Sequence, residues 1–267
     1  MEIESRMQKD CNMSILVTNA KYGSYNSTRK GKNCKMYFEK FGNGKPVVYL
    51  HGWGCDGSVF VPIAKMLPNY SNYLVDFEGF GNTPPPPEDG WSVQDYAESL
   101  RKFLQEQNLS SVTLVGHSFG CRVALVVASE YPQLVERMLL VAPAGLRRFS
   151  LKRTIKVTYY KLYKCVARIF KMQVKQRIAS ADYTNTPDAM KRTFVKVVNS
   201  DLTAYAKRVT CPTLIINGRA DTATPLKHAY NLNKLIPNSN LVEIDGDHFA
   251  FFRMPTAFAN TVKNFVE

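Results

Sequence analysis

The chain has 267 residues, 45% of them hydrophobic and 21% charged, and its formal net charge at neutral pH is +13. This length is sufficient to bury a sizeable core, and the composition is ordinary for a globular protein. No apolar run reaches the length of a signal peptide or of a membrane span. We therefore expect a cytoplasmic protein without a secretion signal or a membrane-spanning helix.

The six cysteines point to the same compartment. They are scattered along the chain, without C-x-x-C pairs and without histidines at the spacing of a zinc site. This pattern is typical of free thiols in a reducing compartment, and it argues against a disulfide framework or a metal site. The six positions are Cys11, Cys34, Cys55, Cys121, Cys165 and Cys211.

Patterns typical of short strands and of helices alternate along most of the chain. Strands are predicted at residues 14–18, 35–41, 47–50, 73–77, 112–115, 137–141, 213–217 and 240–244. A turn region rich in Gly, Ser and Asn is predicted around residues 23–31, and helices at 58–67, 92–107, 123–128, 226–236 and 255–266. This alternation implies βαβ crossovers and therefore predicts a mainly parallel sheet flanked by helices.

The alternation stops after Gly145 and resumes at Thr213. Between these points, residues 147–208 have a helical pattern and hold 16 of the 35 Lys and Arg residues but only three Asp. The excess positive charge therefore belongs to one segment and not to the whole chain. We predict one α/β core domain, formed by residues 1–146 and 209–267, which is interrupted by a basic helical insertion at 147–208.

Two amphipathic helices are predicted inside this insertion. In residues 151–178, apolar side chains recur on one helical face, and basic side chains recur every three or four residues on another. A second helix is predicted to begin at Thr186 with Pro187 in its first position, which is a favoured N-terminal pattern. Its buried stripe would consist of Met190, Phe194 and Val197.

The strand at 112–115 leads directly into Gly-His-Ser-Phe-Gly at 116–120, and an apolar helical run follows at 123–128. Strand, G-x-S-x-G and helix in this order form the pattern of a nucleophile elbow. The two glycines allow a sharp turn without Cβ clashes, so that Ser118 Oγ projects at the N-terminus of a helix. We therefore predict that Ser118 is a catalytic nucleophile. The alternative is a glycine-rich turn with an ordinary capping serine.

A serine nucleophile needs a base to accept its proton and a third group to orient that base. His248 follows the last predicted strand in a glycine-containing loop, where a parallel sheet places its functional groups, and it is the predicted base. Asp221 follows the strand at 213–217 and precedes the histidine, as the acid of such a triad does, although an Asx turn is its alternative role. Asp245 and Asp247 compete for the part of the acid, but their closeness to His248 suits them better to shaping its loop.

An oxyanion hole requires two backbone N–H donors beside the nucleophile. One is predicted to belong to Phe119, the residue after the serine. The second should come from the loop His-Gly-Trp-Gly at 51–54, which follows the strand at 47–50. Trp53 is the better candidate in this loop because it follows a glycine, and its indole would also serve as a hydrophobic lid.

With these residues the chain resembles the α/β-hydrolase fold family. The matching motifs are HGWG, DFEGFG, GHSFG, GRAD and GDH, in the order of the family, and the resemblance covers residues 36–146 and 209–267. It implies an α/β-hydrolase sheet of the eight-stranded type with a helical cap inserted after the sixth strand, and a triad of Ser118, Asp221 and His248. Within the family the chain is most similar to the serine hydrolases grouped with carboxylesterases and meta-cleavage-product hydrolases.

The resemblance also implies a reaction: cleavage of a carboxylic ester or related acyl bond in a small molecule, through an acyl-enzyme intermediate, without a metal or an organic cofactor. A carbon–carbon bond hydrolase of the meta-cleavage-product type and a non-catalytic ligand-binding relative are the alternatives. Two residues depart from the family pattern. Glu78 stands where relatives often have proline, and Cys121, where many have glycine, is predicted to be a small buried packing residue.

The basic face of residues 151–178 is compatible with three roles. It would be the solvated outer face of a cap, a peripheral contact with anionic lipid, or a surface that attracts an anionic soluble substrate. A lipid contact would place the protein where lipid-like acyl substrates are found. Nucleic-acid binding is not expected, because no recognised nucleic-acid-binding module accompanies the charge.

Overall fold

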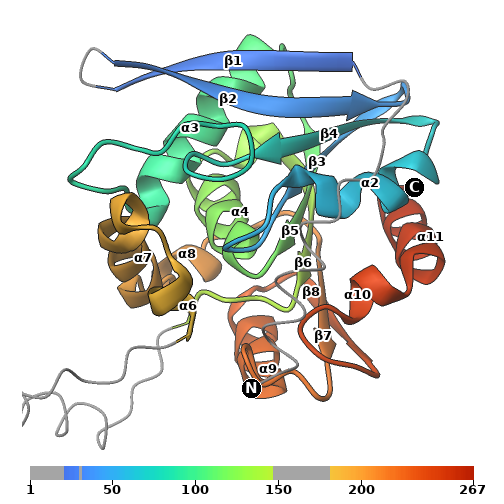
Figure 1. The fold of residues 1–267 in the computed structure, drawn as a ribbon. Helices are drawn as coiled ribbons and strands as arrows, with labels where there is room; N and C mark the ends of the chain where they lie inside the picture. The colour runs from blue at the N-terminus through green and yellow to red at the C-terminus, as the bar shows by residue number, and fades with distance from the viewer. Residues whose placement is uncertain (1–20, 30–31, 147–180) are drawn as a thin grey trace, which may run out of the picture.

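A sheet of eight strands crosses the middle of the molecule, and helices pack on both of its faces (Figure 1). The computed structural model describes residues 21–29, 32–146 and 181–267. The strands are β1 (Lys21–Arg29), β2 (Lys32–Phe41), β3 (Lys45–Leu50), β4 (Tyr70–Asp76), β5 (Val112–His117), β6 (Val135–Val141), β7 (Thr213–Gly218) and β8 (Ser239–Ile244).

The strand order is β1-β2-β4-β3-β5-β6-β7-β8. Strand β2 is antiparallel to both of its neighbours, β1 and β4, and every other neighbouring pair is parallel. The predicted eight-stranded, mainly parallel sheet is therefore confirmed. Because β3 and β5 to β8 run in the same direction, the loops that follow them all leave the same edge of the sheet, where open α/β folds bind their ligands.

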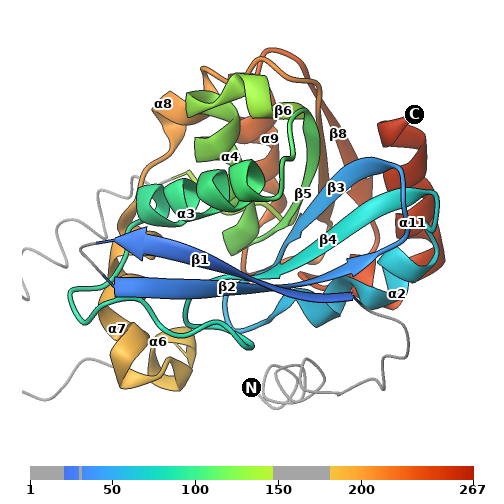
Figure 2. The same ribbon diagram turned by 90° about the horizontal axis from the view of Figure 1, so that it is seen from above.

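The helices form two layers, one on each face of the sheet (Figure 2). The first layer contains α3 (Val93–Glu106), α4 (Phe119–Glu130), α8 (Thr203–Ala206) and α9 (Leu226–Leu235). The second contains α2 (Val61–Lys65), α10 (Ala250–Arg253) and α11 (Pro255–Val266). The remaining described helical segments are α6 (Ala181–Asn185), α7 (Asp188–Asn199), and the 3₁₀ turns η1 (Gly57–Phe60) and η2 (Pro132–Leu134).

The alternation of side chains along the central strands explains why two layers are needed. In β3, Val48 and Leu50 pack against the first layer, whereas Val47 and Tyr49 pack against the second. All four side chains are fully buried. Successive side chains of a strand point to opposite faces, so a strand that is apolar at every position must be covered on both sides.

The first strand corrects one prediction. A turn was predicted around residues 23–31, but residues Lys21–Arg29 form β1, which pairs with β2 in an antiparallel register from Lys21 with Lys40 to Arg29 with Lys32. Gly, Ser and Asn have a low intrinsic preference for strands, but pairing with a neighbouring strand overrides this preference. The strand predicted at 14–18 lies outside the described residues.

The described part of the insertion consists of α6, α7 and α8, which follow β6 in the chain. Helix α7 begins at Asp188, two residues after the predicted start, and its predicted stripe of Met190, Phe194 and Val197 is buried. Residues 147–180 lie outside the described residues, together with the helix predicted at 151–178 and 11 of the 16 basic residues of the insertion.

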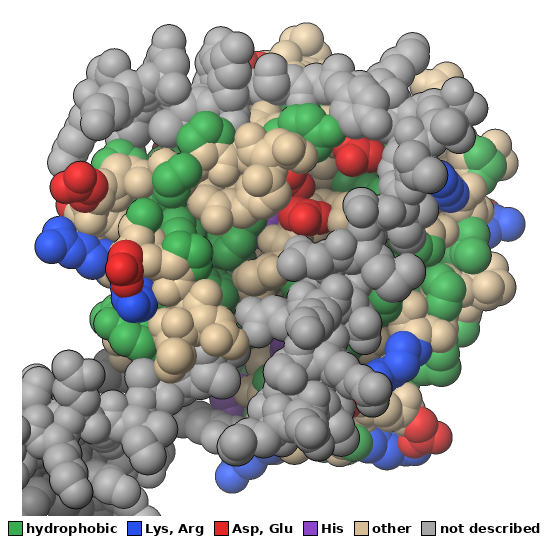
Figure 3. Space-filling view, in the orientation of Figure 1, with side chains coloured by type: hydrophobic (Ala, Val, Ile, Leu, Met, Phe, Trp, Pro, Cys, Tyr) green, Lys and Arg blue, Asp and Glu red, His purple; other side chains and the backbone are tan. Residues whose placement is uncertain are grey.

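On the face seen in Figure 3, hydrophobic side chains gather to the left of the centre and along the right side, and the Lys and Arg side chains of the described residues lie towards the edges. Within the described ranges, no helix is long and apolar enough to cross a membrane. The cysteines at 55, 121 and 211 are free, and Cys121 is fully buried as predicted.

Candidate functional site

Ser118 lies at a sharp turn between the end of β5 and the start of α4. Its φ of 49° and ψ of −102° fall in a region that residues with a side chain rarely adopt. The turn is held by a hydrogen bond from Ser118 N–H to Val141 O on the neighbouring strand β6 (3.0 Å). The serine residue is half-buried. Strained residues that the surrounding structure holds in place are common at active sites.

The two glycines that flank the serine are required by close packing. A Cβ at Gly120 would lie 2.0 Å from Leu50 O in β3, and a Cβ at Gly116 would lie 2.9 Å from Cys121 N. Neither position has room for a larger side chain, because real Cβ atoms do not approach backbone atoms so closely. The G-x-S-x-G pattern therefore has a steric origin in this chain, as the sequence analysis assumed.

Asp221 and His248 are 27 residues apart in the chain and are joined by a hydrogen bond of 2.8 Å from His248 Nδ1 to Asp221 Oδ2. Asp221 follows β7 and His248 follows β8, which are parallel neighbours, so their loops meet at one edge. The Asp221 side chain is fully buried, whereas 17% of the His248 side chain is exposed. Burial acts to raise the pKa of Asp221, but the interactions with His248 and the hydrogen bonds from Thr224 together outweigh it and hold this pKa below its usual value.

Thr224, which the sequence analysis did not single out, lies against this pair. Its backbone N–H donates to Asp221 Oδ1 (2.8 Å), and its hydroxyl lies 2.8 Å from Asp221 Oδ2 and 3.3 Å from His248 Nδ1. The sequence contained one local indication of this role, the spacing of Asp221 and Thr224. A Thr three residues after an Asp can close a turn by donating its N–H to the carboxylate, but such turns are common outside functional sites.

His117 links the serine turn to the histidine loop. Its Nε2 lies 3.0 Å from His248 O, and because a carbonyl oxygen only accepts, Nε2 carries the proton and donates. The two imidazole rings are 4.8 Å apart between centroids. Burial, assisted by the neighbouring His248, holds the pKa of His117 well below its usual value, so the ring is neutral. Among the described residues, no hydrogen bond joins Ser118 to His248. The bond between a nucleophile and its base is often long before a substrate binds.

The loop at 51–54 approaches the serine from the other side. A Cβ at Gly52 would lie 3.5 Å from Ser118 Cβ and 2.7 Å from His117 Nδ1, so only glycine allows this approach. His51 anchors the loop, because its Nδ1–H donates to Gly52 O (2.8 Å) while its Nε2 accepts from Phe77 N–H (3.0 Å). Burial lowers the pKa of His51 to about 4, so it keeps this neutral form.

Of the two residues predicted to supply N–H donors, Phe119 directly follows Ser118, and Trp53 directly follows Gly52 in the loop that approaches it. Phe119 is the first residue of α4, and the first four N–H groups of a helix have no partner within it. The Trp53 indole packs edge-to-face on the Phe119 ring, with 5.4 Å between the ring centroids. Its Nε1–H donates to Thr186 Oγ1 (3.1 Å). The side chain of Trp53 therefore joins the loop to the segment that precedes α7.

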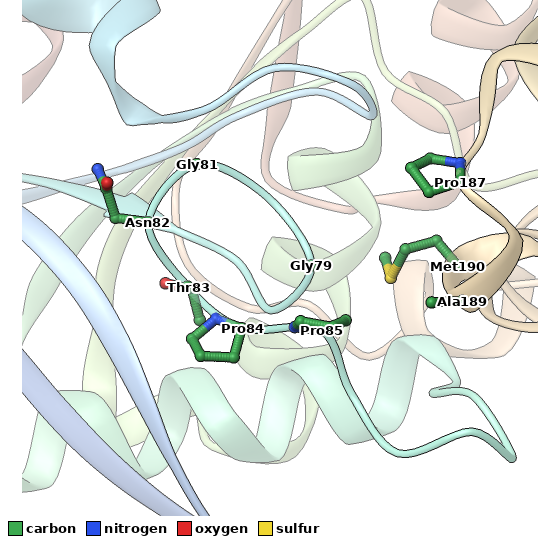
Figure 4. Close-up of a pocket in the computed structure, with 9 residues that line it drawn as sticks. All are labelled: Gly79, Gly81, Asn82, Thr83, Pro84, Pro85, Pro187, Ala189 and Met190. Carbon is green, nitrogen blue, oxygen red and sulfur yellow. The ribbon is translucent and has the colours of Figure 1, made fainter.

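A groove of about 390 Å³ lies beside this region, between the loop at 79–85 and the segment 187–190 at the start of α7 (Figure 4). Neither Ser118 nor His248 lines it. A Cβ at Gly79 would overlap Met190 Sδ at 2.3 Å, which shows how closely α7 rests on this loop. Among the described residues, no group of three or more His, Cys, Asp or Glu side chains could hold a metal ion.

Residues 45–159 match the family model described as alpha/beta hydrolase fold. A pimeloyl-[acyl-carrier protein] methyl ester esterase of Legionella pneumophila (strain Paris) is 27% identical over 248 residues, which cover 87% of this chain and 99% of the esterase. Among solved structures, a thermophilic esterase from Thermogutta terrifontis has a TM-score of 0.72 at 20% identity and covers 92% of this chain and 98% of its own.

A second solved structure, the enol-lactonase from Burkholderia xenovorans LB400, has a TM-score of 0.70 at 18% identity, with 91% of this chain and 99% of the lactonase covered. These likenesses extend over most of the chain.

Proposed function

Because this chain is a hydrolase of the α/β-hydrolase fold family, we propose that Ser118, His248 and Asp221 form its catalytic triad and that it cleaves a carboxylic ester. The hydrogen bond between His248 Nδ1 and the buried Asp221 carboxylate, at the strand ends beside the serine turn, is the observation that carries this proposal. A buried acid in this position fixes the imidazole with its other nitrogen free to accept the serine proton.

The proposed reaction has two steps. In the first, His248 Nε2 accepts the Ser118 proton, Ser118 Oγ attacks the ester carbonyl, and the alcohol leaves with the proton that the histidine returns. In the second, His248 activates water, which hydrolyses the acyl-enzyme and releases the acid. The N–H groups of Trp53 and Phe119 would hold the oxyanion that forms in each step. No metal or organic cofactor takes part in this scheme.

An ester is the preferred substrate class because of what the similar proteins act on. The names of the Legionella pneumophila and Burkholderia xenovorans proteins describe a methyl ester esterase and an enol-lactonase, and both of these linkages are esters. We infer a small-molecule acyl substrate for this chain. We also propose that residues 147–208 form a cap over the site, which the contacts of Trp53 with Thr186 and of Gly79 with Met190 support.

The location and the charge of the protein remain part of the proposal. We expect it in the cytoplasm, where its free cysteines at 55, 121 and 211 would stay reduced. The basic segment at 151–178 would be the solvated face of the cap, attract an anionic substrate, or meet anionic lipid. Binding to vesicles with and without anionic lipid, compared at low and high salt, would distinguish the lipid contact from the other two roles.

The test is labelling with a serine-directed fluorophosphonate and turnover of p-nitrophenyl esters. Ser118→Ala should abolish labelling and lower turnover more than about 10³-fold, and Asp221→Asn should lower turnover by about 10⁴-fold. Ser110→Ala makes the same chemical change at an exposed loop and should leave both unchanged.

Each other outcome points to a different function. Labelling of the wild type without turnover of any ester would favour the carbon–carbon bond hydrolase. Folded wild-type protein that is not labelled at all would contradict the triad and favour a ligand-binding protein. A series of acyl lengths would then separate a short-chain esterase from a lipid-directed enzyme.

A further inference from the structure

The Asp221 carboxylate is held mainly by one residue, Thr224. Of the hydrogen bonds that it receives, the backbone N–H and the hydroxyl of Thr224 supply two, each at 2.8 Å, and His248 supplies the third. Thr224 is itself 7% exposed, so water has little access to replace these donors. A carboxylate fixed at both oxygens cannot rotate away from the imidazole, which is the requirement for an acid that orients a base.

The hydroxyl of Thr224 has one proton and two oxygen acceptors within reach. It lies 2.8 Å from Asp221 Oδ2 and 3.0 Å from Ala142 O, which follows the end of β6. The ionised carboxylate is the stronger acceptor, so the proton is directed to Asp221 while the carboxylate is charged. The carbonyl of Ala142 is the alternative acceptor of the same proton.

Ala142 is itself held in an unusual conformation. Its φ is 47°, in the left-handed region that residues other than glycine rarely adopt, and its N–H donates to Ile216 O of β7 (2.8 Å). Such a conformation persists where the surroundings hold it. Because the chain turns at Ala142, its carbonyl faces the Thr224 hydroxyl. The contact therefore joins the loop that follows β6 to the loop that follows β7.

We propose that Thr224 is a positioning residue of the triad, whose hydroxyl fixes the Asp221 carboxylate and tempers the negative charge that it presents to His248. The inference rests on the proposed function. With the hydroxyl present, the carboxylate shares its charge between Thr224 and His248 at the same oxygen, Oδ2. Without it, that oxygen would act on the imidazole alone and would favour the protonated ring more strongly.

The other titratable groups that face His248 are His117 and Asp247, besides Asp221 itself. His117 stays neutral because burial holds its pKa well below the usual range. Asp247 pairs with Arg253 on α10 and accepts from Phe249 N–H. Among the described residues, neither forms a hydrogen bond with Thr224. A substitution at 224 therefore changes the surroundings of His248 through Asp221.

The experiment compares the rate of fluorophosphonate labelling as a function of pH in wild type and in Thr224→Val, Thr224→Cys and Thr224→Ser. Valine has the shape of threonine without a donor, cysteine keeps a weak donor, and serine keeps the hydroxyl. In Thr224→Val we expect the plateau rate to fall about 10- to 100-fold and the rising limb of the profile to move up by about 0.5 to 1 pH unit. Thr224→Ser should keep the rising limb at the wild-type pH, and the rising limb of Thr224→Cys should lie between those of wild type and Thr224→Val.

Thr222→Val is the matched control, because Thr222 is exposed in the same loop and should give the wild-type profile. If Thr224→Val has the wild-type labelling rate and the wild-type pH profile, the inference is overturned. It is also overturned if Thr224→Val is slower but the rising part of its profile stays at the same pH or moves to lower pH. In that case the substitution has only displaced the Asp221 carboxylate. If Thr224→Val does not fold, the rising part of the profile is compared in Thr224→Ser, which should match wild type, and in Thr224→Cys, which should lie at higher pH. A wild-type protein that is not labelled refutes the proposed function instead.

Discussion

Replacing Glu78 with glutamine should remove a large part of the pH dependence of this protein's stability. Glu78 is fully buried in the loop after β4 and hydrogen-bonds Ser99 of α3 through one carboxyl oxygen. Its other oxygen, Oε2, has no partner. A buried carboxylate in these surroundings is costly, and burial raises the pKa of Glu78 from 4.5 to about 7 against the opposing effect of the Ser99 hydrogen bond.

The size of the effect follows from the two pKa values. Between pH 4.5 and 7 the folded state keeps the Glu78 proton while the unfolded state has lost it, so stability falls as the pH rises. A pKa difference of about 2.5 units corresponds to about 3 kcal/mol of unfolding free energy, at about 1.36 kcal/mol per unit. This stabilisation is fully present below pH 4.5 and is lost as the pH rises through 7.

The assay is urea unfolding, followed by tryptophan fluorescence at several pH values from 5 to 8.5. Asp76, whose pKa burial raises to about 6, also contributes to the wild-type slope, so the informative quantity is the difference between wild type and Glu78→Gln. Glutamine keeps an acceptor for Ser99 but leaves half of its amide without a partner, at the place of Oε2. This cost is the same at every pH, so it lowers the stability without adding a pH dependence. Glu106→Gln, at the exposed end of α3, is the control. If Glu78→Gln retained the wild-type slope, the reasoning would be wrong.

Three further substitutions test other parts of the structure. Gly120→Ala should lower the unfolding free energy by about 3 kcal/mol in urea denaturation, because its Cβ would meet a backbone oxygen of β3 at 2.0 Å; a change below about 1 kcal/mol would contradict the steric argument. Arg122→Met removes hydrogen bonds to two carbonyl groups at the end of α7 (3.1 and 3.2 Å), so amide hydrogen exchange should accelerate in α7 and not in β5. His117→Phe keeps a ring but leaves His248 O without its donor, and should slow fluorophosphonate labelling about tenfold; an unchanged rate would show that this hydrogen bond does not position the base.

The sequence alone was sufficient where neighbouring residues decide the structure. Ser92 caps α3 by accepting from Asp95 N–H, and the predicted helix at 92–107 agrees with α3 to within a residue at each end. The elbow is also local, because the two glycines and the serine lie within five residues and the adjoining strand and helix follow at once. The turn predicted around 23–31 failed for the opposite reason, since its strand depends on pairing with β2.

For the candidate site, the sequence determined which residue types stand at which strand ends, and so singled out Ser118, Asp221 and His248. Only the tertiary structure decided that the last two meet at 2.8 Å and that Thr224 holds the acid. It also decided that Glu78, noticed in the sequence only as a departure from a family pattern, is buried with a raised pKa. The physical reason is that backbone conformation is governed largely by adjacent residues, whereas these contacts and burials depend on the order of the strands and on how separate loops converge at one edge of the sheet.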